Sequence, residues 1–395
     1  MGNEILQKAQ ELKDYVTKIR RQIHQNPELG MQEFETTALV RGELEKMGVE
    51  IAPLDMKVGL LGVLEGEKPG SGPVIGIRAD MDALPIEERT GLPYASQKGG
   101  VMHACGHDGH TAILLGTAKL LSTIKDKFSG TVKFIFQPGE ETLKGAKSVV
   151  DAGVFGHEPK IDILIAAHSW PFVEVGKIGV WSGPYMASSD AFAAKIIGSG
   201  GHGAYPHRAK DPLLAACNAV GALQGIISRQ IDAAERVVLS VCTIHGGKAF
   251  NVIPEEVTFS GTVRTHNKEV RDSMEKRMEK VIKGAAEAYD CKYEFDYDYG
   301  IPQVINDPEV VEKIIEAANM AVGEGHAEQL PGPVMGSEDF AVLLEYVPRG
   351  AFFRLGILKP GEEPISPHND RYNFNDDAIP YGMAIFTQFV LNSSK

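Results

Sequence analysis

The chain has 395 residues, of which 43% are hydrophobic and 24% are charged. That much apolar surface excludes intrinsic disorder, and the length corresponds to two or three domains rather than to one small binding module. The 40 lysines and arginines against 53 aspartates and glutamates give a formal net charge of -13, which disfavours nucleic acid and anionic membranes as partners.

The N-terminal segment and the cysteines bear on the cellular compartment. Residues 1–13 form a charged helical pattern without the hydrophobic core of a secretion signal, and no apolar stretch is long enough to span a bilayer. We therefore expect a cytoplasmic protein. The cysteines are too sparse for a disulfide framework. They are Cys105, Cys217, Cys242 and Cys291. A functional cysteine is expected to be a reactive thiol or a metal ligand.

The first half of the chain alternates predicted helices and strands. Helical spacing of apolar residues predicts a helix over 5–23 that ends at Asn26-Pro27, and a second over 33–47 that ends at Gly48. Strands are expected at 60–64, 74–79, 132–136 and 161–166, and further helices near 110–122 and 144–152. This alternation favours an α/β fold with a largely parallel sheet covered on both faces.

The pattern changes from about Gly183. Strands are expected at 191–197, 237–244, 257–263 and 292–297, with two long helices near 212–228 and 268–288. They suggest an α+β sandwich with a four-stranded sheet. Beyond it, helices are expected at 308–322, 338–344 and 376–391, and a strand at 351–355. The simplest organisation is a main domain of residues 1–182 and 298–395, with a second domain inserted at 183–297.

One short segment concentrates metal-binding residue types. Residues 101–110, which open a predicted helix, contain three histidines, a cysteine and an aspartate. Cys105 and His107 can reach one cation because Gly106 between them allows a sharp turn of the backbone. The alternative is a solvent-exposed polar turn.

Two adjacent carboxylates follow another predicted strand. The apolar run 134–136 leads directly into Glu140 and Glu141. Ligands in open α/β sheets bind beyond the carboxyl ends of strands, so one carboxylate could bind a metal while the other acts as a general base. The alternative is a pair of acids that stabilise a helix N-terminus.

Further polar residues follow the other strands of the predicted sheet. Asp80 and Asp82 end the strand at 74–79, His168 follows the strand at 161–166, and His368 lies in a late loop. Together with the segment at 101–110 they favour a shared metal centre. The ligand types are too numerous for one four-coordinate catalytic zinc, so two divalent metal ions are expected, zinc or manganese, with cobalt or nickel as alternatives.

The inserted domain contains a glycine-rich turn, residues 198–207, with His202 at its centre. Since it lies in a different domain from the metal-binding residues, His202 could contribute only across a cleft or from another subunit. A plain loop between a strand and a helix explains the composition equally well. Neither a GxxxxGK[ST] phosphate loop nor a GxSxG elbow occurs in the chain.

Eight motifs, spread in order along nearly the whole chain, resemble one known family. They are RADMDALP (78–85), MHACGHDGH (102–110), FQPGEE (136–141), AAH (166–168), GGHGAYPH (200–207), NVIP (251–254), GSEDF (336–340) and SPHN (366–369). The chain is similar to the dinuclear metallopeptidases and amidohydrolases that include hippurate hydrolase, indoleacetyl-amino-acid hydrolase, N-acetyl-diaminopimelate deacetylase and related aminoacylases and carboxypeptidases. The resemblance implies a metallopeptidase-like catalytic domain with an inserted lid domain. We expect a homodimer or higher homo-oligomer to form through the inserted domain, because a long edge strand there would otherwise stay unpaired.

The resemblance also implies roles for individual residues. The implied metal ligands are Cys105, His107, Glu141, His168 and His368. Glu140 would be the general base, and Asp82 would orient a ligand. His202 would stabilise the oxyanion from the neighbouring subunit, as in dimeric relatives, and Asn251 and Arg264 match positions that contact the substrate carboxylate in some relatives.

Two positions depart from the family pattern. Asp80 stands where many peptidases of the wider family have a metal-binding histidine, so the Cys105 and His107 pattern matches the amidohydrolase branch. Gly139 stands where that branch usually has alanine, a change that we expect to be harmless.

Four functional hypotheses follow. The first is hydrolysis of the amide bond of an N-acyl (acetyl, benzoyl or similar) amino acid by a metal-activated water, with Glu140 as base. The second is a carboxypeptidase or dipeptidase that uses the same centre on short peptides. A metal-independent hydrolase with Cys105 as nucleophile would leave the surplus of carboxylates and histidines unused. A non-enzymatic binding protein is disfavoured by the intact Glu140 and the complete ligand set.

Overall fold

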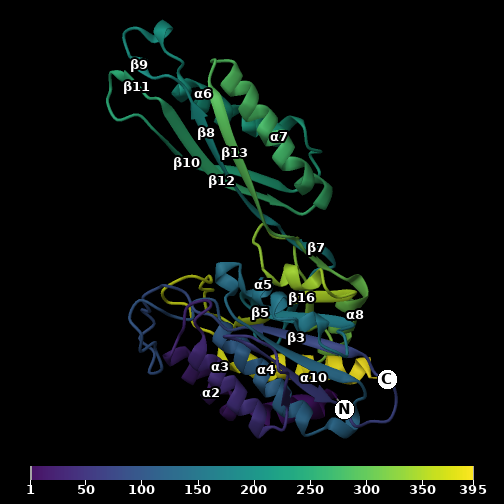
Figure 1. The fold of residues 1–395 in the computed structure, drawn as a ribbon. Helices are drawn as coiled ribbons and strands as arrows, with labels where there is room; N and C mark the ends of the chain where they lie inside the picture. The colour runs from purple at the N-terminus through teal and green to yellow at the C-terminus, as the bar shows by residue number, and fades with distance from the viewer. Residues whose placement is uncertain (1, 395) are drawn as a thin grey trace. The chain divides into compact units, whose positions relative to one another are not determined.

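The computed structural model describes residues 2–394, which form two compact units (Figure 1). Unit 1 lies within Met1–Gly183, Ile305–Gly332 and Asp339–Lys395, and unit 2 comprises Pro184–Val304 and Pro333–Glu338. Among the described residues, no helix has the length and apolar character needed to cross a membrane.

Unit 1 is built on an eight-stranded sheet with the strand order β1-β2-β4-β3-β5-β16-β6-β15. Its strands are β1 (Glu50–Ile51), β2 (Leu60–Glu65), β3 (Val74–Asp80), β4 (Thr131–Gln137), β5 (Ile163–Glu174), β6 (Ile178–Val180), β15 (Ala327–Gln329) and β16 (Arg349–Leu358). The central strands β4, β3, β5 and β16 are parallel, whereas β2 and β6 join the sheet antiparallel to β4 and β16. The expected α/β fold with a mixed, mostly parallel sheet is confirmed.

Helices cover both faces of this sheet, as Figure 1 shows. They are α1 (Gly2–Glu11), α2 (Lys13–Gln25), α3 (Phe34–Lys46), α4 (His107–Ser122), α5 (Gly145–Asp151), α8 (Pro308–Ala321), α9 (Phe340–Leu344) and α10 (Ile379–Ser393). The main core lies between the sheet and a layer that contains α2, α4 and α10, and α4 is buried on almost every side. The single helix predicted over 5–23 is wrong in one respect, because α1 ends at Glu11 and α2 begins at Lys13.

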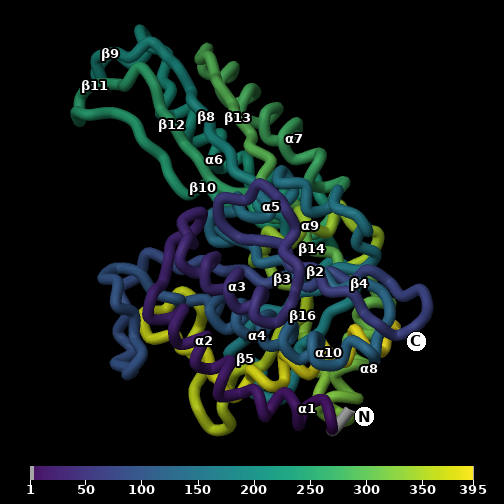
Figure 2. The backbone as a smooth tube through the Cα atoms, turned by 60° about the horizontal axis from the view of Figure 1, so that its bottom comes forward, coloured from purple at the N-terminus to yellow at the C-terminus, as the bar shows by residue number. Residues whose placement is uncertain are grey.

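Unit 2 contains a four-stranded antiparallel sheet with the order β10-β12-β8-β13. Its strands are β8 (Ser189–Ile197), β10 (Val237–Gly246), β12 (Glu256–Thr265) and β13 (Lys292–Ile301). Helices α6 (Pro212–Arg229) and α7 (Lys268–Glu287) run along it (Figure 2). Alternate residues of β8, including Phe192 and Ile196, pack with apolar residues of these helices in a separate core. The expected additional α+β sandwich is confirmed.

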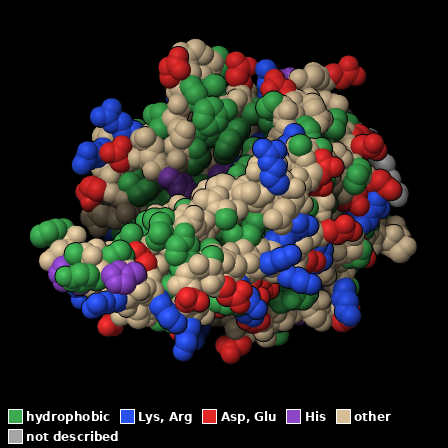
Figure 3. Space-filling model, turned by 90° about the horizontal axis from the view of Figure 1, so that it is seen from above, with side chains coloured by type: hydrophobic (Ala, Val, Ile, Leu, Met, Phe, Trp, Pro, Cys, Tyr) green, Lys and Arg blue, Asp and Glu red, His purple; other side chains and the backbone are tan. Residues whose placement is uncertain are grey.

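Short strands complete the fold. In unit 2, β9 (Gly201–His202) pairs antiparallel with β11 (Val252–Ile253) in a small ribbon. Two further short strands, β7 (Gly183–Met186) and β14 (Val304–Asn306), lie in the sequence where the chain passes from one unit to the other. On the face that Figure 3 shows, acidic and basic side chains are interspersed rather than gathered by sign.

Candidate metal centre

The sheet of unit 1 brings the candidate residues to one edge. β3 ends at Asp80 and β4 ends at Gln137, and their parallel pairing places Asp82 near Glu140 and Glu141, which follow β4. β3 is also parallel to β5 and pairs with it up to Ala166, two residues before His168. His168 was expected just beyond a strand, but β5 continues to Glu174 because β16 keeps pairing with it. His168 is therefore held inside a strand.

Helix α4 supplies two more candidates from its first turn. Its N-cap is Gly106 with a φ of 88°, a left-handed conformation that favours glycine. A Cβ atom at Gly106 would lie 2.5 Å from Ser169 Oγ and 2.8 Å from the Tyr372 hydroxyl. Both the backbone conformation and the available space thus require glycine between Cys105 and His107.

Five candidate ligands converge in unit 1: Cys105, His107, Glu141, His168 and His368. Cys105 Sγ lies 3.3 Å from His168 Nε2. Glu141 Oε1 lies 3.1 Å from His368 Nε2 and 4.0 Å from His107 Nε2. Ligand atoms of Cys105, His107 and His168 lie within 4.8 Å of one another, as do those of Cys105, Glu141 and His368. The arrangement consists of two overlapping groups that share the cysteine.

Two atoms at the centre of this arrangement test whether the residues suit a cation. His107 Nε2 is buried and has no hydrogen-bond partner within the described part of the chain, and the buried Glu141 Oε1 beside it has an ion-pair contact of 3.1 Å with His368 Nε2. Leaving a buried polar atom unpaired costs about 1–3 kcal/mol, so a bound cation is a natural partner for His107 Nε2. Thiolate, imidazole and carboxylate ligands together suit zinc and its neighbours among the divalent ions. The residues therefore fit divalent metal ions.

Asp82 connects the ligands to the adjacent carboxylate pair. Its Oδ1 lies 3.1 Å from His107 Nδ1 and accepts a 3.1 Å hydrogen bond from the backbone N–H of Glu140, and its Oδ2 accepts one of 3.0 Å from the N–H of Glu141. A proton on His107 Nδ1 leaves Nε2 with a lone pair that faces the centre. Glu140 is buried, and its carboxylate lies with His107 and Glu141 in a third compact group.

Burial and neighbouring charges shift the pKa values of these groups. Burial raises the pKa of the Cys105 thiol to about 12 and lowers that of His168 well below its usual value. Burial also acts to lower the pKa of His107, but Asp80, Cys105 and Asp82 together raise it well above its usual value. A thiol with so high a pKa is a poor nucleophile unless a cation stabilises the thiolate, which disfavours Cys105 as a metal-independent nucleophile.

Sequence reasoning assigned no role to several residues that touch the ligands. His110 Nδ1 lies 2.6 Å from Asp80 Oδ1, and its Nε2 accepts a 2.8 Å hydrogen bond from the N–H of Ser169. The hydroxyl groups of Tyr372 and Ser169 form a hydrogen bond of 2.9 Å. The high density of histidines in residues 101–110 was a signal for His110, but the sequence held none for Ser169 or Tyr372.

The candidate residues of unit 2 lie at two separate places. His202 in β9 and Asn251 next to β11 are exposed, and the Asn251 carbonyl accepts a 2.8 Å hydrogen bond from the N–H of Gly203. Arg264 lies near the other end of β12, about 26 Å from Glu256 at 3.3 Å per strand residue. The ribbon thus brings His202 and Asn251 together, whereas Arg264 is far from both.

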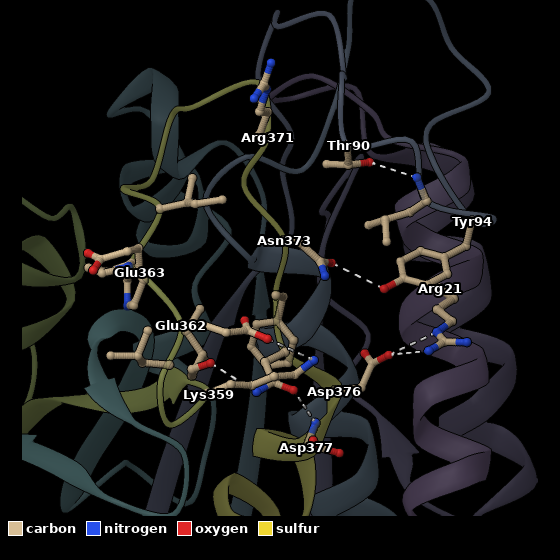
Figure 4. A pocket seen from close by; sticks show the side chains of 18 of the residues that line it. Arg21, Thr90, Tyr94, Lys359, Glu362, Glu363, Arg371, Asn373, Asp376 and Asp377 are labelled. Carbon is tan, nitrogen blue, oxygen red and sulfur yellow. Dashed lines mark hydrogen bonds and ion pairs between the residues drawn. The ribbon is translucent and has the colours of Figure 1, made fainter.

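A cavity of unit 1, of about 580 Å³, lies between α2 and the segments 89–94 and 357–377 (Figure 4). Some of its charged side chains pair with one another, for example Arg21 with Asp376 at 2.8 Å. The Tyr94 hydroxyl donates to Asn373 Oδ1 across it at 3.3 Å. We assign no ligand to this cavity.

Comparisons with known proteins agree with this geometry. A family model described as Peptidase family M20/M25/M40 matches residues 76–392. An N-acetyl-L-cysteine deacetylase of Bacillus subtilis is 41% identical over 89% of this chain and 85% of that protein. A hippurate hydrolase of Campylobacter jejuni is 40% identical over 96% of both chains. A solved structure from Bacillus subtilis, described as a dinuclear metal binding peptidase, is 36% identical with a TM-score of 0.83, over 97% of this chain and 98% of that one.

Proposed function

The chain belongs to peptidase family M20/M25/M40, and from this premise we propose that it is a metal-dependent amidohydrolase that cleaves the amide bond of N-acyl amino acids. The observation that carries the proposal is the convergence of five ligand-type side chains beside the buried carboxylate of Glu140. N-acetylcysteine and hippurate, named in the descriptions of two relatives, are both N-acyl amino acids, which supports that substrate class.

We propose that the centre holds two divalent metal ions, zinc or manganese, with cobalt or nickel as alternatives. The ligands would be Cys105, His107, Glu141, His168 and His368. The unpaired ring nitrogen of His107, which lies 4.0 Å from the Glu141 carboxylate, supports this assignment. When bound, the ions supply a more acidic water and polarise the carbonyl of the amide.

The chain's own residues would then move the proton. Glu140 takes a proton from the attacking water and delivers it to the nitrogen of the leaving amine. Asp82 holds the backbone of Glu140 and Glu141 and fixes the proton of His107 on Nδ1, so that the base and two ligands keep one arrangement. Burial of Glu140 limits competing contacts with water.

Unit 2 would complete the site as a lid and dimerisation domain, for which the sequence-based limits remain 183–297. His202 would stabilise the oxyanion, while Asn251 and Arg264 would bind the substrate carboxylate. One copy of unit 2 holds Arg264 about 26 Å from the end of β12 next to the ribbon, which exceeds the length of an N-acyl amino acid. In a pair of chains, one chain could bring its ribbon and the other its Arg264 to the same substrate. This possibility supports a homodimer. The cytoplasmic location expected from the sequence stays a prediction.

One experiment tests the reaction and its alternative together. Enzyme stripped with a chelator and reloaded with zinc, manganese, cobalt or nickel would be offered N-acetyl, N-benzoyl and indoleacetyl amino acids beside dipeptides, and release of amine would be measured. Metal-restored cleavage of one acyl class is the expected result. Activity that resists chelation, or no activity with any metal, would contradict the proposal.

A carboxypeptidase or dipeptidase is the second candidate, because the matching family model is described as a peptidase family. The same centre could act on a peptide bond. A higher kcat/KM for dipeptides than for every acylated amino acid in the panel would favour this alternative.

A further inference from the structure

We propose that Ser169, Tyr372 and His110 form a hydrogen-bonded clasp that holds Cys105 and His168 in their ligand positions. The three would be positioning residues and not ligands. The inference rests on the proposed metal centre and goes beyond it, because it identifies what fixes two of the ligands.

Ser169 touches both ligand residues. Its carbonyl accepts a 2.7 Å hydrogen bond from His168 Nδ1, so the proton of that ring lies on Nδ1 and the lone pair of Nε2 faces Cys105 Sγ, 3.3 Å away. Its hydroxyl lies 3.3 Å from the carbonyl oxygen of Cys105. One residue thereby sets the tautomer of one ligand and the backbone position of the other.

Tyr372 links Ser169 and Cys105 to a third segment of the chain. Its hydroxyl lies 2.9 Å from Ser169 Oγ and 3.5 Å from the Cys105 carbonyl oxygen. It follows His368 closely in the chain, and the N–H of His368 donates to the carbonyl of Ala104 at 2.8 Å. The clasp therefore joins three segments that carry three of the candidate ligands.

His110 completes the clasp and has no free nitrogen. A backbone N–H can only donate, so the 2.8 Å hydrogen bond from Ser169 requires His110 Nε2 to be unprotonated. The remaining ring proton lies on Nδ1 and is donated to Asp80 Oδ1 at 2.6 Å. Asp80, His107 and His110 also form a compact group of ligand types. Because both nitrogens of His110 already have partners, we assign this histidine a positioning role.

The clasp is buried and closely packed. Ser169, His110 and Tyr372 are 0%, 5% and 1% exposed. The space that a Cβ at Gly106 would need is occupied by the Ser169 and Tyr372 hydroxyls. Hydrogen bonds in such an environment are strengthened by the low local dielectric, and partners of metal ligands typically contribute about 10–100-fold to metal affinity.

Ser169→Ala and Tyr372→Phe test the clasp, since each removes one oxygen and keeps the rest of the side chain. The metal-free protein would be titrated with Co²⁺, and the near-ultraviolet thiolate-to-cobalt band would report ligation by Cys105. We expect Co²⁺ affinity to fall about 10–100-fold in Ser169→Ala, and by less in Tyr372→Phe, with a weaker or shifted band.

Tyr297→Phe is the matched control. It also removes a buried tyrosine hydroxyl, one that donates to Asp190 Oδ2 at 3.1 Å in unit 2. We expect it to lower the melting temperature and leave the cobalt titration unchanged. Wild-type affinity and an unchanged band in both clasp variants would overturn the proposal. Absence of the band in the wild type would refute the metal centre itself, which is a distinguishable failure.

His110→Gln separates a positioning residue from a ligand. The new amide oxygen can still accept from the N–H of Ser169, whereas the contact with Asp80 is lost. We expect two ions to bind at saturation, with lower affinity. A stoichiometry of one ion would show that His110 is a ligand and would overturn this part of the proposal.

Discussion

The metal centre of unit 1 and the ribbon of unit 2 hold their candidate residues in opposite ways. In the centre, His107 and His168 are buried, and each has one ring nitrogen fixed by a hydrogen bond. In the ribbon, His202 and Asn251 are exposed, and the imidazole of His202 accepts only a local hydrogen bond from the N–H of Ala204 among its described contacts. The first group is held by buried hydrogen bonds, whereas the second is exposed and held by few contacts.

This difference suggests a division of labour. Electrostatic stabilisation of a reaction is most effective when the groups are already in place, so the chemistry is concentrated where the packing is tight. If the exposed residues of the ribbon meet the substrate as proposed, fixing their side chains on binding would lower the binding energy that they provide. We therefore expect substitutions in unit 1 to affect metal binding or the chemical step, and those in the ribbon to affect kcat or KM while the metal content stays unchanged.

The largest effect is expected from Glu140→Gln, which removes the proton carrier and keeps a side chain of similar size. We expect kcat to fall about 10²–10⁴-fold with the metal content unchanged, as measured by steady-state kinetics and elemental analysis. Turnover close to that of the wild type would refute the proposed role of Glu140.

His202→Ala comes next, with an expected loss of about 10²–10³-fold in kcat and an unchanged metal content. Mixing this variant with Glu140→Gln then tests whether His202 acts across a dimer. In a hybrid dimer one site has Glu140 from one chain and His202 from the other, so part of the activity should return after subunit exchange. No recovery, in hybrids verified by mass spectrometry, would place the action of His202 within its own chain.

A smaller effect is expected from Asp82→Asn, because the amide nitrogen cannot accept the hydrogen bonds that both carboxylate oxygens now accept. We expect metal affinity to fall about 10–100-fold, as measured by competition with a chromogenic chelator. An affinity equal to that of the wild type would show that the ligands are fixed without Asp82.

The smallest change in stability is expected from Asn251→Ala. Its side chain is exposed, so the free energy of unfolding should stay within about 0.5 kcal/mol of the wild type, measured by urea denaturation. A higher KM at constant metal content would support the proposed contact with the substrate carboxylate. A loss of metal from Asn251→Ala would contradict the expectation that substitutions in the ribbon leave the metal centre of unit 1 intact.

Much of the fold was predictable because its signals are local. The helix at 33–47 and the strand at 74–79 correspond to α3 (Phe34–Lys46) and β3 (Val74–Asp80), since apolar periodicity and Gly48 mark their limits. The break after Glu11 was missed because apolar spacing continues through it. The extension of β5 past His168 was missed as well, because it depends on pairing with β16, which lies far along the chain.

The candidate site shows the same limit. The concentration of ligand types in residues 101–110 pointed to Cys105 and His107 directly. The contacts of Ser169 and Tyr372 arise from tertiary packing alone, so no spacing in the sequence predicts them. The separation of Arg264 from the ribbon follows from the direction and length of β12, which a list of motifs does not convey.

The length of β12 has a consequence for how the protein would behave at different abundances. If one active site needs both ends of that strand and two chains supply them, the rate per chain depends on the chain's own concentration. Dilution below the dissociation constant of the dimer would then abolish activity, although the metal ligands of each chain would be unchanged. Over a dilution series below that constant, specific activity would fall in proportion to the chain concentration and total activity with its square, so that a modest change in expression becomes a larger change in flux.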